Sequence, residues 1–305
     1  MINSVLRQGY RAEFIHHEPG MRCFNSGMLE KKDGLYLATR RGEARSSLHN
    51  IVISKLTGSS PKPVAVVKIP RVHGREQFED ARLFMHRGKV HMSYVEGRYW
   101  KTPRLALQKL AILDDNWKVE RVIDIEFGDN GFGQEKNWQF FSRNDRLYFV
   151  YSIAPHITVE LDKDYKVRKR WIVDVNNSFM GLLRGGTPPQ HVGGGYQAFV
   201  HFHTEHFTRM RRYAMCSYKF RDKPPFEPYA LSEVLLRASE EDPVIPNLGT
   251  PDWNPLVVFP CGVVRRKDHW LVSAGINDSL DVLLKLPLKL KHGAVYGVER
   301  KFKTL

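Results

Sequence analysis

The sequence predicts an all-β fold, a five-bladed β-propeller built from four-stranded antiparallel blades. Short runs rich in Val, Ile, Leu, Tyr and Phe dominate the 305 residues, and Gly, Asp and Asn turns separate them. No long stretch keeps the i, i+3, i+4, i+7 spacing of an amphipathic helix. A hairpin with the same order of features also recurs five times, which is typical of a repeat architecture.

Each recurring hairpin opens with polar or small residues, passes through a short strand, turns on Gly or Asp, and returns through an aromatic-rich strand. The five copies cover residues 25–41, 73–97, 135–156, 184–203 and 257–278. Their turn residues are Gly34, Gly88, Asp145, Gly194 and Asp268. The interval before Asp268 is longer than the others, and we interpret residues 237–255 within it as an insertion on one rim.

Further strand-like runs lie between the hairpins, at residues 49–56, 104–113, 157–167 and 211–220. Two hairpins make the four strands of one blade, so five blades use the chain as a single domain over residues 1–305. The early run at 4–14 is expected to complete the last blade and close the ring. A pair of β-sandwiches is the competing architecture, but it does not explain the recurring polar opening.

Polar residues that look misplaced one at a time are expected to form one site. In a propeller, the starts of the first strands and the ends of the second strands meet around one mouth of the central channel. The strand starts supply Asn25, Asp80, Arg82, Lys136, Asn137, Thr187 and Cys261. The strand ends supply Arg40, Arg41, Glu96, His156, His201, His203, Asn277 and Asp278.

The formal net charge of +14 favours an anionic partner, such as phosphate, a nucleotide sugar, an acidic glycan, nucleic acid or an anionic membrane surface. A solvated basic surface is the alternative. The basic residues are spread along the chain, for example at 166–170 and 209–212, which weakens the case for a dedicated nucleic-acid stripe.

The sequence carries no sign of secretion or of a membrane span. No apolar run approaches the roughly 18 residues that cross a bilayer, and the N-terminus lacks the apolar core of a secretory signal. Cys23, Cys216 and Cys261 are odd in number and have no metal-like spacing. We therefore expect a reduced, cytoplasmic protein without disulfides. Nothing in the sequence indicates its oligomeric state.

Asp80 is either a general acid or half of a structural ion pair. In a regular strand Asp80 and Arg82 point to one face and Glu79 to the other, so only one carboxylate of the pair should face the channel. Lys136 and the Arg40–Arg41 pair are candidate oxyanion ligands, because cationic side chains bind phosphate-like groups through charge-assisted hydrogen bonds.

The segment HFHTEH contains His201, His203 and His206, and the first two share a strand face, which permits a metal site. No ligand spacing supports it, so anion binding or packing of neutral imidazoles is favoured, and no metal or other cofactor is expected. Phosphate-loop, dinucleotide and nucleophile-elbow motifs are missing from the sequence.

With these openings identified, the chain resembles the five-bladed propeller enzymes of glycoside hydrolase family 130, mostly inverting phosphorylases of β-mannosides. It also resembles the related β-1,2-mannosyltransferases that use GDP-mannose. FEDARL (78–83) is similar to the family's acid motif, with Ala81 replacing the usual proline, and the resemblance makes Asp80 the proton donor. EKNWQFF (135–141) resembles the segment whose lysine, here Lys136, contacts phosphate.

Three more motifs carry the resemblance. LYLATRR (35–41) and AFVH (198–201) resemble strands that supply a phosphate-site arginine, Arg40, and histidine, His201. SAGIND (273–278) resembles the motif whose aspartate, Asp278, contacts the sugar. The family commonly ends the third-blade strand in His-Arg, whereas this chain has YSIAPH (151–156). Two explanations of the missing arginine stay open: His156 substitutes for it, or the donor differs from that of the phosphorylases.

The balance of charges at the predicted mouth favours transfer to or from phosphate. An inverting hydrolase needs two well-separated carboxylates, whereas a phosphate nucleophile or leaving group needs cations. We expect a sugar substrate together with phosphate or a nucleotide sugar, with an anionic glycan as a further possible acceptor. The phosphate or nucleotide contacts are expected from Arg40, Arg41, Lys136, His156 and His201. The substrate contacts are expected from Asn25, Arg82, Asn137, Thr187, His203 and Asp278.

The first hypothesis is therefore an inverting β-mannoside phosphorylase. A GDP-mannose-type glycosyltransferase is the alternative. A non-catalytic propeller that binds an anionic glycan or nucleic acid is a third reading.

Overall fold

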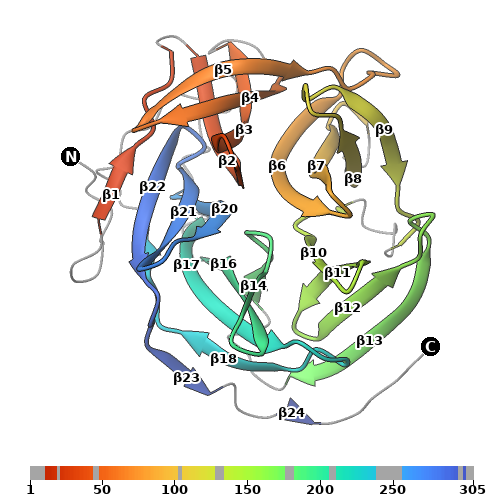
Figure 1. The fold of residues 1–305 in the computed structure, drawn as a ribbon, viewed down its shortest axis with the longest axis vertical. Coiled ribbons are helices and arrows are strands. Elements are labelled where there is room, and N and C mark those ends of the chain that lie inside the picture. Colours follow the sequence, from red (N-terminus) through yellow and green to blue (C-terminus); the bar gives the residue numbers. More distant parts are fainter. Residues whose placement is uncertain are drawn as a thin grey trace.

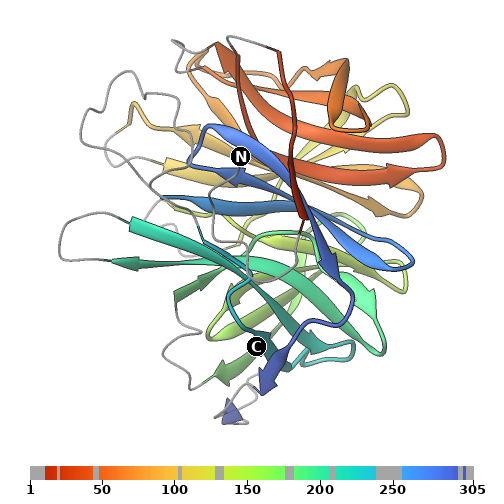
Figure 2. The same ribbon diagram turned by 90° about the vertical axis from the view of Figure 1, so that its left-hand side faces the viewer.

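The computed structural model describes residues 11–18, 21–43, 48–101, 105–127, 134–175, 182–205, 211–237, 256–294 and 298–299. Across these ranges the regular structure is antiparallel β-sheet, and no α-helix occurs, so the all-β prediction is confirmed. Five sheets lie around a common centre in a propeller arrangement (Figure 1). Figure 2 shows their strands running from one face of the molecule towards the other. None of the described residues forms a helix with the length and apolar character that spanning a membrane requires.

Three sheets have the four strands that were predicted. The first contains β2 (Met21–Lys31), β3 (Gly34–Glu43), β4 (Asn50–Thr57) and β5 (Ser60–Val67). The second contains β6 (Gln77–His86), β7 (Lys89–Arg98), β8 (Leu105–Leu113) and β9 (Val119–Asp124). The last contains β20 (Val258–Arg265), β21 (His269–Ile276), β22 (Leu280–Pro287) and β1 (Arg11–Phe14).

The pairing of β1 with β22 confirms that the early strand completes the last sheet. Residues 4–10 of the predicted run lie outside the described residues, as do 238–255 of the predicted insertion.

The other two sheets have more than four strands. The third contains β10 (Gln139–Arg143), β11 (Arg146–Ile153), β12 (His156–Leu161), β13 (Val167–Val175) and β24 (Val298–Glu299). The fourth contains β14 (Leu183–Arg184), β15 (Gln190–Val192), β16 (Gly195–Glu205), β17 (Arg211–Arg221), β18 (Pro228–Ser232), β19 (Leu236–Arg237) and β23 (His292–Ala294). The additions β23 and β24 follow the last sheet in sequence and pair with the outer strands β18 and β13 (Figure 1).

The run at 157–167, predicted as one strand, is divided between β12 and β13. The Asp162 carboxylate accepts hydrogen bonds from the backbone N–H groups of Asp164 and Lys166, at 2.8 and 2.9 Å. Such a side-chain-stabilised turn competes with continuation of the strand, which explains the break.

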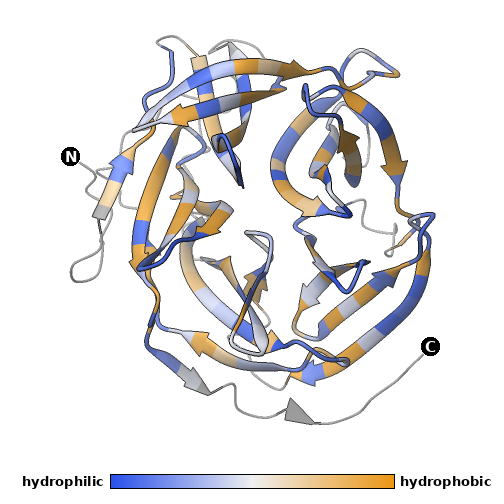
Figure 3. Ribbon diagram, viewed as in Figure 1, coloured by the Kyte–Doolittle hydropathy of each residue, from blue (hydrophilic) through white to orange (hydrophobic). Residues whose placement is uncertain are grey.

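An apolar core lies between each sheet and the next. Along the strands, apolar and polar residues alternate, as the orange and blue segments of Figure 3 show. Separate buried clusters join the first sheet to the second, the second to the third, the third to the fourth, the fourth to the last, and the last back to the first. The cluster between the third and fourth sheets is aromatic, with Phe141, Tyr196 and Phe220 in contact. These contacts hold the inner strands β2, β6, β10 and β20 around one channel.

Candidate active site

The starts of the inner strands have irregular backbone that places polar side chains beside one another. Asn25, Asp80 and Asn137 have positive φ angles of 56°, 51° and 68°. β-Bulges interrupt the strand pairing next to Asn25 and Asp80. A bulge redirects a side chain, and left-handed backbone in a non-glycine residue costs about 1–2 kcal/mol. Such strain concentrates at functional sites, and it recurs here at the starts of three successive sheets.

Asp80 is held by its neighbour from the first sheet. The Asn25 Nδ2 group donates a hydrogen bond of 2.8 Å to Asp80 Oδ1, and both residues are buried. The buried Asn25 Oδ1 has no partner within the described part of the chain. The carboxylate of Asp80 is thus oriented by the amide of Asn25.

Glu79 lies on the same side as Asp80, which corrects the expectation from strand alternation. Glu79 Oε1 is 3.0 Å from Arg40 Nη2, and the Tyr99 hydroxyl donates to Glu79 Oε2 at 2.9 Å. Burial alone would lower the pKa of Arg40, but the carboxylates of Glu79, Asp80 and Asp278 outweigh it and raise the pKa. The bulge at Asp80 explains the difference, because an extra residue breaks the two-residue period.

Asp278 is the third carboxylate near Arg40. It lies in the turn after β21, where Asn277 and Asp278 have φ angles of 50° and 48°. Burial raises the pKa of Asp278, and Asp80 and Glu79 raise it further, while Arg40 and Arg22 oppose the shift. Carboxylates from two sheets therefore surround one guanidinium, which makes this half of the mouth suited to binding sugar hydroxyls.

Arg82 forms the centre of the other half of the mouth. Its side chain is fully buried, and its guanidinium donates to the Asp80 carbonyl at 3.5 Å and to Asn137 Oδ1 at 3.3 Å. The guanidinium also lies 5.5 Å from the ring centroid of Phe259. Among the described residues, no carboxylate forms an ion pair with it, and its Nε has no partner. A buried cation without an anion costs several kcal/mol, so the geometry around Arg82 suits an anionic ligand.

Other basic side chains gather near Arg82. His201 is almost fully buried, with its ring centroid 4.5 Å from that of Phe259. Burial holds the pKa of His201 well below its usual value, and the positive charges of Arg82, Lys136, His203 and Arg184 contribute to the same shift. The imidazole is therefore neutral, and its Nδ1 lacks a partner within the described ranges.

A cleft adjoins this cationic half of the mouth. Its volume is about 350 Å³, and Lys136, Asn137, Tyr151 and Arg184 are among the residues that line it. Asn137 also accepts a hydrogen bond from Arg82, so one residue of the cleft wall contacts the buried guanidinium. Lys136 is exposed at its edge.

Three predicted site residues do not join the mouth. Arg41 follows Arg40 on β3, so it points to the opposite face, where it forms an ion pair with Glu18. Thr187 is fully buried, and its hydroxyl accepts a hydrogen bond of 3.0 Å from the backbone N–H of Phe199.

His156 is the third of these residues. It begins β12 instead of ending β11, and it is fully buried with its ring centroid 5.4 Å from that of Phe220. Burial lowers the pKa of His156 to about 3. A neutral imidazole in the core cannot replace the missing arginine.

The histidine segment of β16 gives no metal site among the described residues, where no group of three or more His, Cys, Asp or Glu side chains could hold an ion. His203 packs edge-on against Tyr213, with ring centroids 5.3 Å apart. His206 lies outside the described residues.

Sequence reasoning missed Tyr99 and Phe259 as neighbours of the site. Tyr99 directly follows β7, and Phe259 lies two residues before Cys261 at the start of β20, so their positions beside predicted site residues were the available signal.

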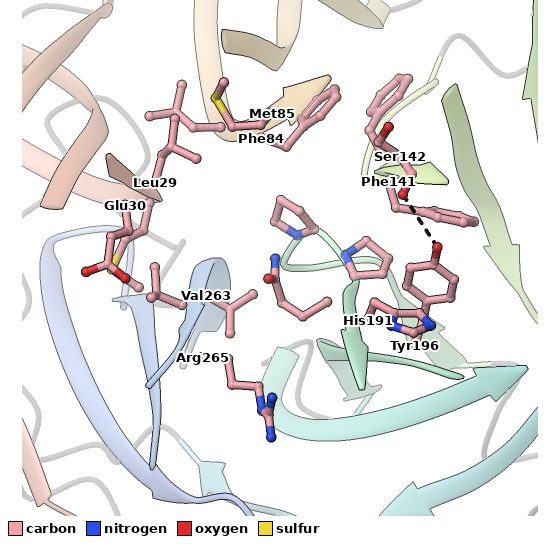
Figure 4. A pocket seen from close by; sticks show the side chains of 17 residues that line it. Leu29, Glu30, Phe84, Met85, Phe141, Ser142, His191, Tyr196, Val263 and Arg265 are labelled. Atoms are coloured by element: carbon pink, nitrogen blue, oxygen red, sulfur yellow. Dashed lines mark hydrogen bonds between the residues drawn. The ribbon is translucent and has the colours of Figure 1, made fainter. Parts of the chain in front are cut away.

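The opposite end of the channel has a different chemistry. The far ends of the inner strands line a cavity of about 400 Å³, and its wall includes Leu29, Phe84, Met85, Phe141 and Val263 (Figure 4). These five apolar side chains are half of those labelled there, and Glu30 and Arg265 are the labelled side chains with a full charge. The concentration of buried charges at the other mouth marks that mouth as the candidate active site.

The fold is shared with enzymes that act on mannosides. The β-1,2-mannobiose phosphorylase of Listeria innocua is 16% identical, with a TM-score of 0.60 over 89% of this chain and 92% of the phosphorylase. The GDP-Man-dependent mannosyltransferase MPT-1 of Leishmania mexicana is 12% identical, with a TM-score of 0.63 over 91% and 89% of the two chains. This chain has the fold of these propeller enzymes.

A mannose phosphorylase from the same parasite, MPT-4, solved with a phosphate ion, also shares this fold at 12% identity, with a TM-score of 0.60 over 91% of this chain and 89% of MPT-4. No protein-family profile matches the chain, and no curated protein sequence does. At these identities the likeness establishes the fold.

Proposed function

We propose that the protein is a carbohydrate-active enzyme that transfers a glycosyl group, of a mannose-like sugar, to or from a phosphate group. We further propose that the five sheets are the blades of a five-bladed propeller, forming one domain over residues 1–305. The observation that carries the functional proposal is the buried Arg82, which has no carboxylate partner among the described residues and lies two residues from Asp80. A structural cation would be paired, whereas this one suits a phosphate.

The favoured reaction is inverting phosphorolysis of a β-mannoside. Asp80, oriented by Asn25, is the general acid that protonates the glycosidic oxygen, directly or through a sugar hydroxyl. A phosphate oxygen attacks the anomeric carbon from the opposite face, and the bond to the leaving sugar breaks. Arg82, Lys136 and His201 are assigned to phosphate, and Asp278 is assigned to the sugar. The phosphorylases with this fold support the assignment.

Arg40 receives a different role from the one predicted. Its ion pair with Glu79 and its proximity to Asp80 and Asp278 make it the group that neutralises the carboxylates. We assign it to the positioning of those carboxylates and of the sugar, and we assign the contacts with phosphate to Arg82.

Transfer from a nucleotide sugar is the second candidate. The cleft beside Asn137 offers about 350 Å³ bordered by Lys136 and Arg184, more room than inorganic phosphate needs. A nucleoside diphosphate would place its phosphates near Arg82 and its remaining part in this cleft. The mannosyltransferase with the same fold supports this candidate.

A thermal-shift panel with activity assays tests the proposal. Phosphate, mannose 1-phosphate, GDP and GDP-mannose are each added to the wild type, Asp80→Asn, Arg82→Met and the control Arg146→Met, whose side chain is 54% exposed. Release of mannose 1-phosphate from β-1,2-mannobiose and phosphate is measured in parallel. We expect phosphate to stabilise all variants except Arg82→Met, and turnover to be lost in Asp80→Asn.

Each other outcome has a defined meaning. Stabilisation by GDP and GDP-mannose alone would replace phosphorolysis by nucleotide-sugar transfer. If none of the four ligands stabilises the wild type, and Arg82→Met binds a polyanion such as heparin as tightly as the wild type, the enzyme proposal is wrong and the charged surface is the binding site.

A further inference from the structure

Aromatic side chains occupy the rim of the mouth on the second sheet, which also carries Asp80. The chain turns after β7, and the Lys101 N–H donates to the Arg98 carbonyl at 3.2 Å to close that turn. Tyr99 and Trp100 are its two central residues, and both are partly exposed. Glycine and small polar residues suit such positions. The turn itself therefore does not require two aromatic side chains.

Tyr99 connects this turn to the candidate active site. Its hydroxyl donates at 2.9 Å to Glu79 Oε2, and the other oxygen of that carboxylate pairs with Arg40. Burial and the charge of Glu79 raise the pKa of Tyr99, so its hydroxyl stays a donor. Its ring packs against the backbone of Gly97, where an added Cβ would lie 2.5 Å from the ring. The turn is thereby fixed beside the carboxylates of the mouth.

Trp100 lies against the segment that leads into β6. The ring centroids of Trp100 and His73 are 6.1 Å apart, with their planes at 70°. His73 and its neighbour Val72 are exposed, and Val72, at 77%, is the most exposed large apolar side chain among the described residues. We call Trp100, His73 and Val72 the rim patch.

The segment that carries Val72 and His73 is held in place by its own hydrogen bonds. The carboxylate of Glu76, a residue that is 1% exposed, accepts the backbone N–H groups of His73 and Arg75 at 2.7 and 3.1 Å. The Nε of Arg71 donates to the Glu76 carbonyl at 3.1 Å. The exposed apolar surface is thus presented by an ordered segment, and exposed apolar surface beside a polar mouth is typical of a binding site.

The size and chemistry of the rim patch fit a sugar ring. A stable protein interface buries about 800 Å² per partner and involves about 20–30 residues, whereas one buried aromatic side chain contributes about 150–250 Å². Three side chains are therefore too few for a protein partner. A pyranose packs its C–H face on an indole ring, and its hydroxyl groups need polar neighbours. The exposed His73 and Arg75 provide such neighbours beside Trp100.

The location of the rim patch decides which sugar it can contact. In an inverting reaction the nucleophile and the leaving group lie on opposite faces of the transferred sugar. With phosphate at Arg82, the leaving sugar lies in the half of the mouth that contains Arg40 and Asp80. Tyr99 adjoins that half through its bond to the carboxylate that pairs with Arg40. Trp100 follows Tyr99 and lies farther out on the rim.

We propose that the rim patch is a distal glycan-binding subsite, which holds the part of an oligosaccharide beyond the leaving sugar. The inference rests on the proposed glycosyl transfer at Asp80, and it names the substrate class as a glycan of more than two sugars. A transferase would use the same surface for its acceptor chain. Contacts far from the reacting bond hold substrate and transition state equally, so the rim patch should lower KM and leave kcat unchanged.

The test measures binding by calorimetry in Asp80→Asn, where turnover is lost, with β-1,2-mannobiose and β-1,2-mannotetraose as probes. We expect the tetraose to bind at least tenfold more tightly than the biose. Adding Trp100→Ala should weaken tetraose binding at least tenfold and biose binding less than twofold. Val72→Ser should weaken tetraose binding about threefold, whereas the control Val64→Ser, which replaces a 50% exposed valine of β5, should change neither.

Equal affinities for the two glycans, or binding of neither, overturn the proposal. A Trp100→Ala that weakens both glycans equally also overturns it, because the residue would then support the active site. Where Trp100→Ala does not fold, an unchanged tetraose affinity in Val72→Ser has the same meaning.

The proposed glycosyl transfer is judged separately, by the loss of phosphate binding in Arg82→Met. A tetraose preference that depends on Trp100, without release of mannose 1-phosphate, would keep the subsite and refute phosphorolysis. Turnover of the tetraose with the same kcat/KM in the wild type and in Trp100→Ala would refute the subsite and keep the reaction.

Discussion

Replacing Arg82 by methionine should stabilise the unliganded protein or leave its stability unchanged, while removing its affinity for phosphate. The guanidinium is fully buried, with hydrogen bonds of 3.3 and 3.5 Å and no ion-pair partner among the described residues. Replacing buried ionic groups by apolar residues of similar size is often neutral or stabilising by about 1–4 kcal/mol. The lost hydrogen bond to Asn137 offsets about 1 kcal/mol of this gain. We therefore expect a net gain of about 0–3 kcal/mol.

The expected change is measurable by calorimetry or thermal shift in phosphate-free buffer. Unfolding entropies near 2.1 cal/mol/K per residue give about 0.6 kcal/mol/K for the 305 residues, so Tm should be unchanged or rise by up to about 5 °C. Phosphate at about a hundred times its Kd should stabilise the wild type by about 2.7 kcal/mol. This corresponds to about 4 °C, so saturating phosphate should cancel or reverse the difference between the two proteins.

Arg146→Met is the matched control for Arg82→Met. Arg146→Met replaces an arginine that is 54% exposed and paired with Glu160, and it should change Tm by less than about 2 °C under both conditions. A fall of more than 3 °C for Arg82→Met in phosphate-free buffer would show that the guanidinium holds the Asp80 bulge together. Arg82 would then be a structural residue, and the argument for an anion site would fail.

Two further predictions concern Asn25 and His17. A Cβ added in Gly275→Ala would lie 1.9 Å from Asn25 Oδ1, so Asn25 should move and lose its hydrogen bond to Asp80. In steady-state assays kcat should therefore fall, with a smaller change in KM. The control Gly293→Ala, whose added Cβ would have nothing within 4 Å, should match the wild type. His17, whose Nε2 lies 3.0 Å from Asp281 Oδ2, has a folded-state pKa of about 9, above its ordinary 6.5. Its contribution to the free energy of unfolding is therefore about 3 kcal/mol, which is complete below pH 6.5 and is lost as the pH rises through 9. Urea unfolding should therefore show a smaller loss of stability between pH 6 and pH 9.5 for His17→Gln than for the wild type, and equal losses would contradict the assignment.

Much of the fold was predictable because a hairpin is a local structure. The pairs Asn144–Asp145 and Gly193–Gly194 have positive φ angles between two strands, the conformation that tight hairpin turns need, and their residue types are visible in the sequence. The pairing of β23 and β24 with outer strands was not predictable. Edge pairings between segments distant in sequence leave no periodic signal, and both strands are only two or three residues long.

The candidate site was predictable as a set of residues but not in its contacts. Asn25, Asp80, Arg82 and Asn137 do come together through direct hydrogen bonds, because they occupy equivalent strand starts. The side of the strand that each residue faces depends on register, and one inserted residue reverses it. The bulge at Asp80 thus brought Glu79 to Arg40.

The three residues that lie elsewhere fail for similar physical reasons. The end of β11 at Ile153 left His156 to begin the next strand inside the core. Thr187 bonds Phe199 within its own sheet, a contact that no spacing in the sequence records. Arg41 faces away from the mouth because β3 keeps its regular alternation there.

The pairing of β1 with β22 has a consequence for how the molecule assembles. Arg11 lies opposite Lys285, so closing the ring joins segments on the order of 270 residues apart, at an entropic cost of about 5 kcal/mol. During synthesis β1 precedes the other described strands and its partner β22 follows all of the inner strands, and until they meet the edge of β22 is open to any other strand. The same edge accepts β1 from a second copy as readily as from its own chain. We therefore expect strand-exchanged dimers when the protein refolds at high concentration, and only monomers when it refolds in dilute solution.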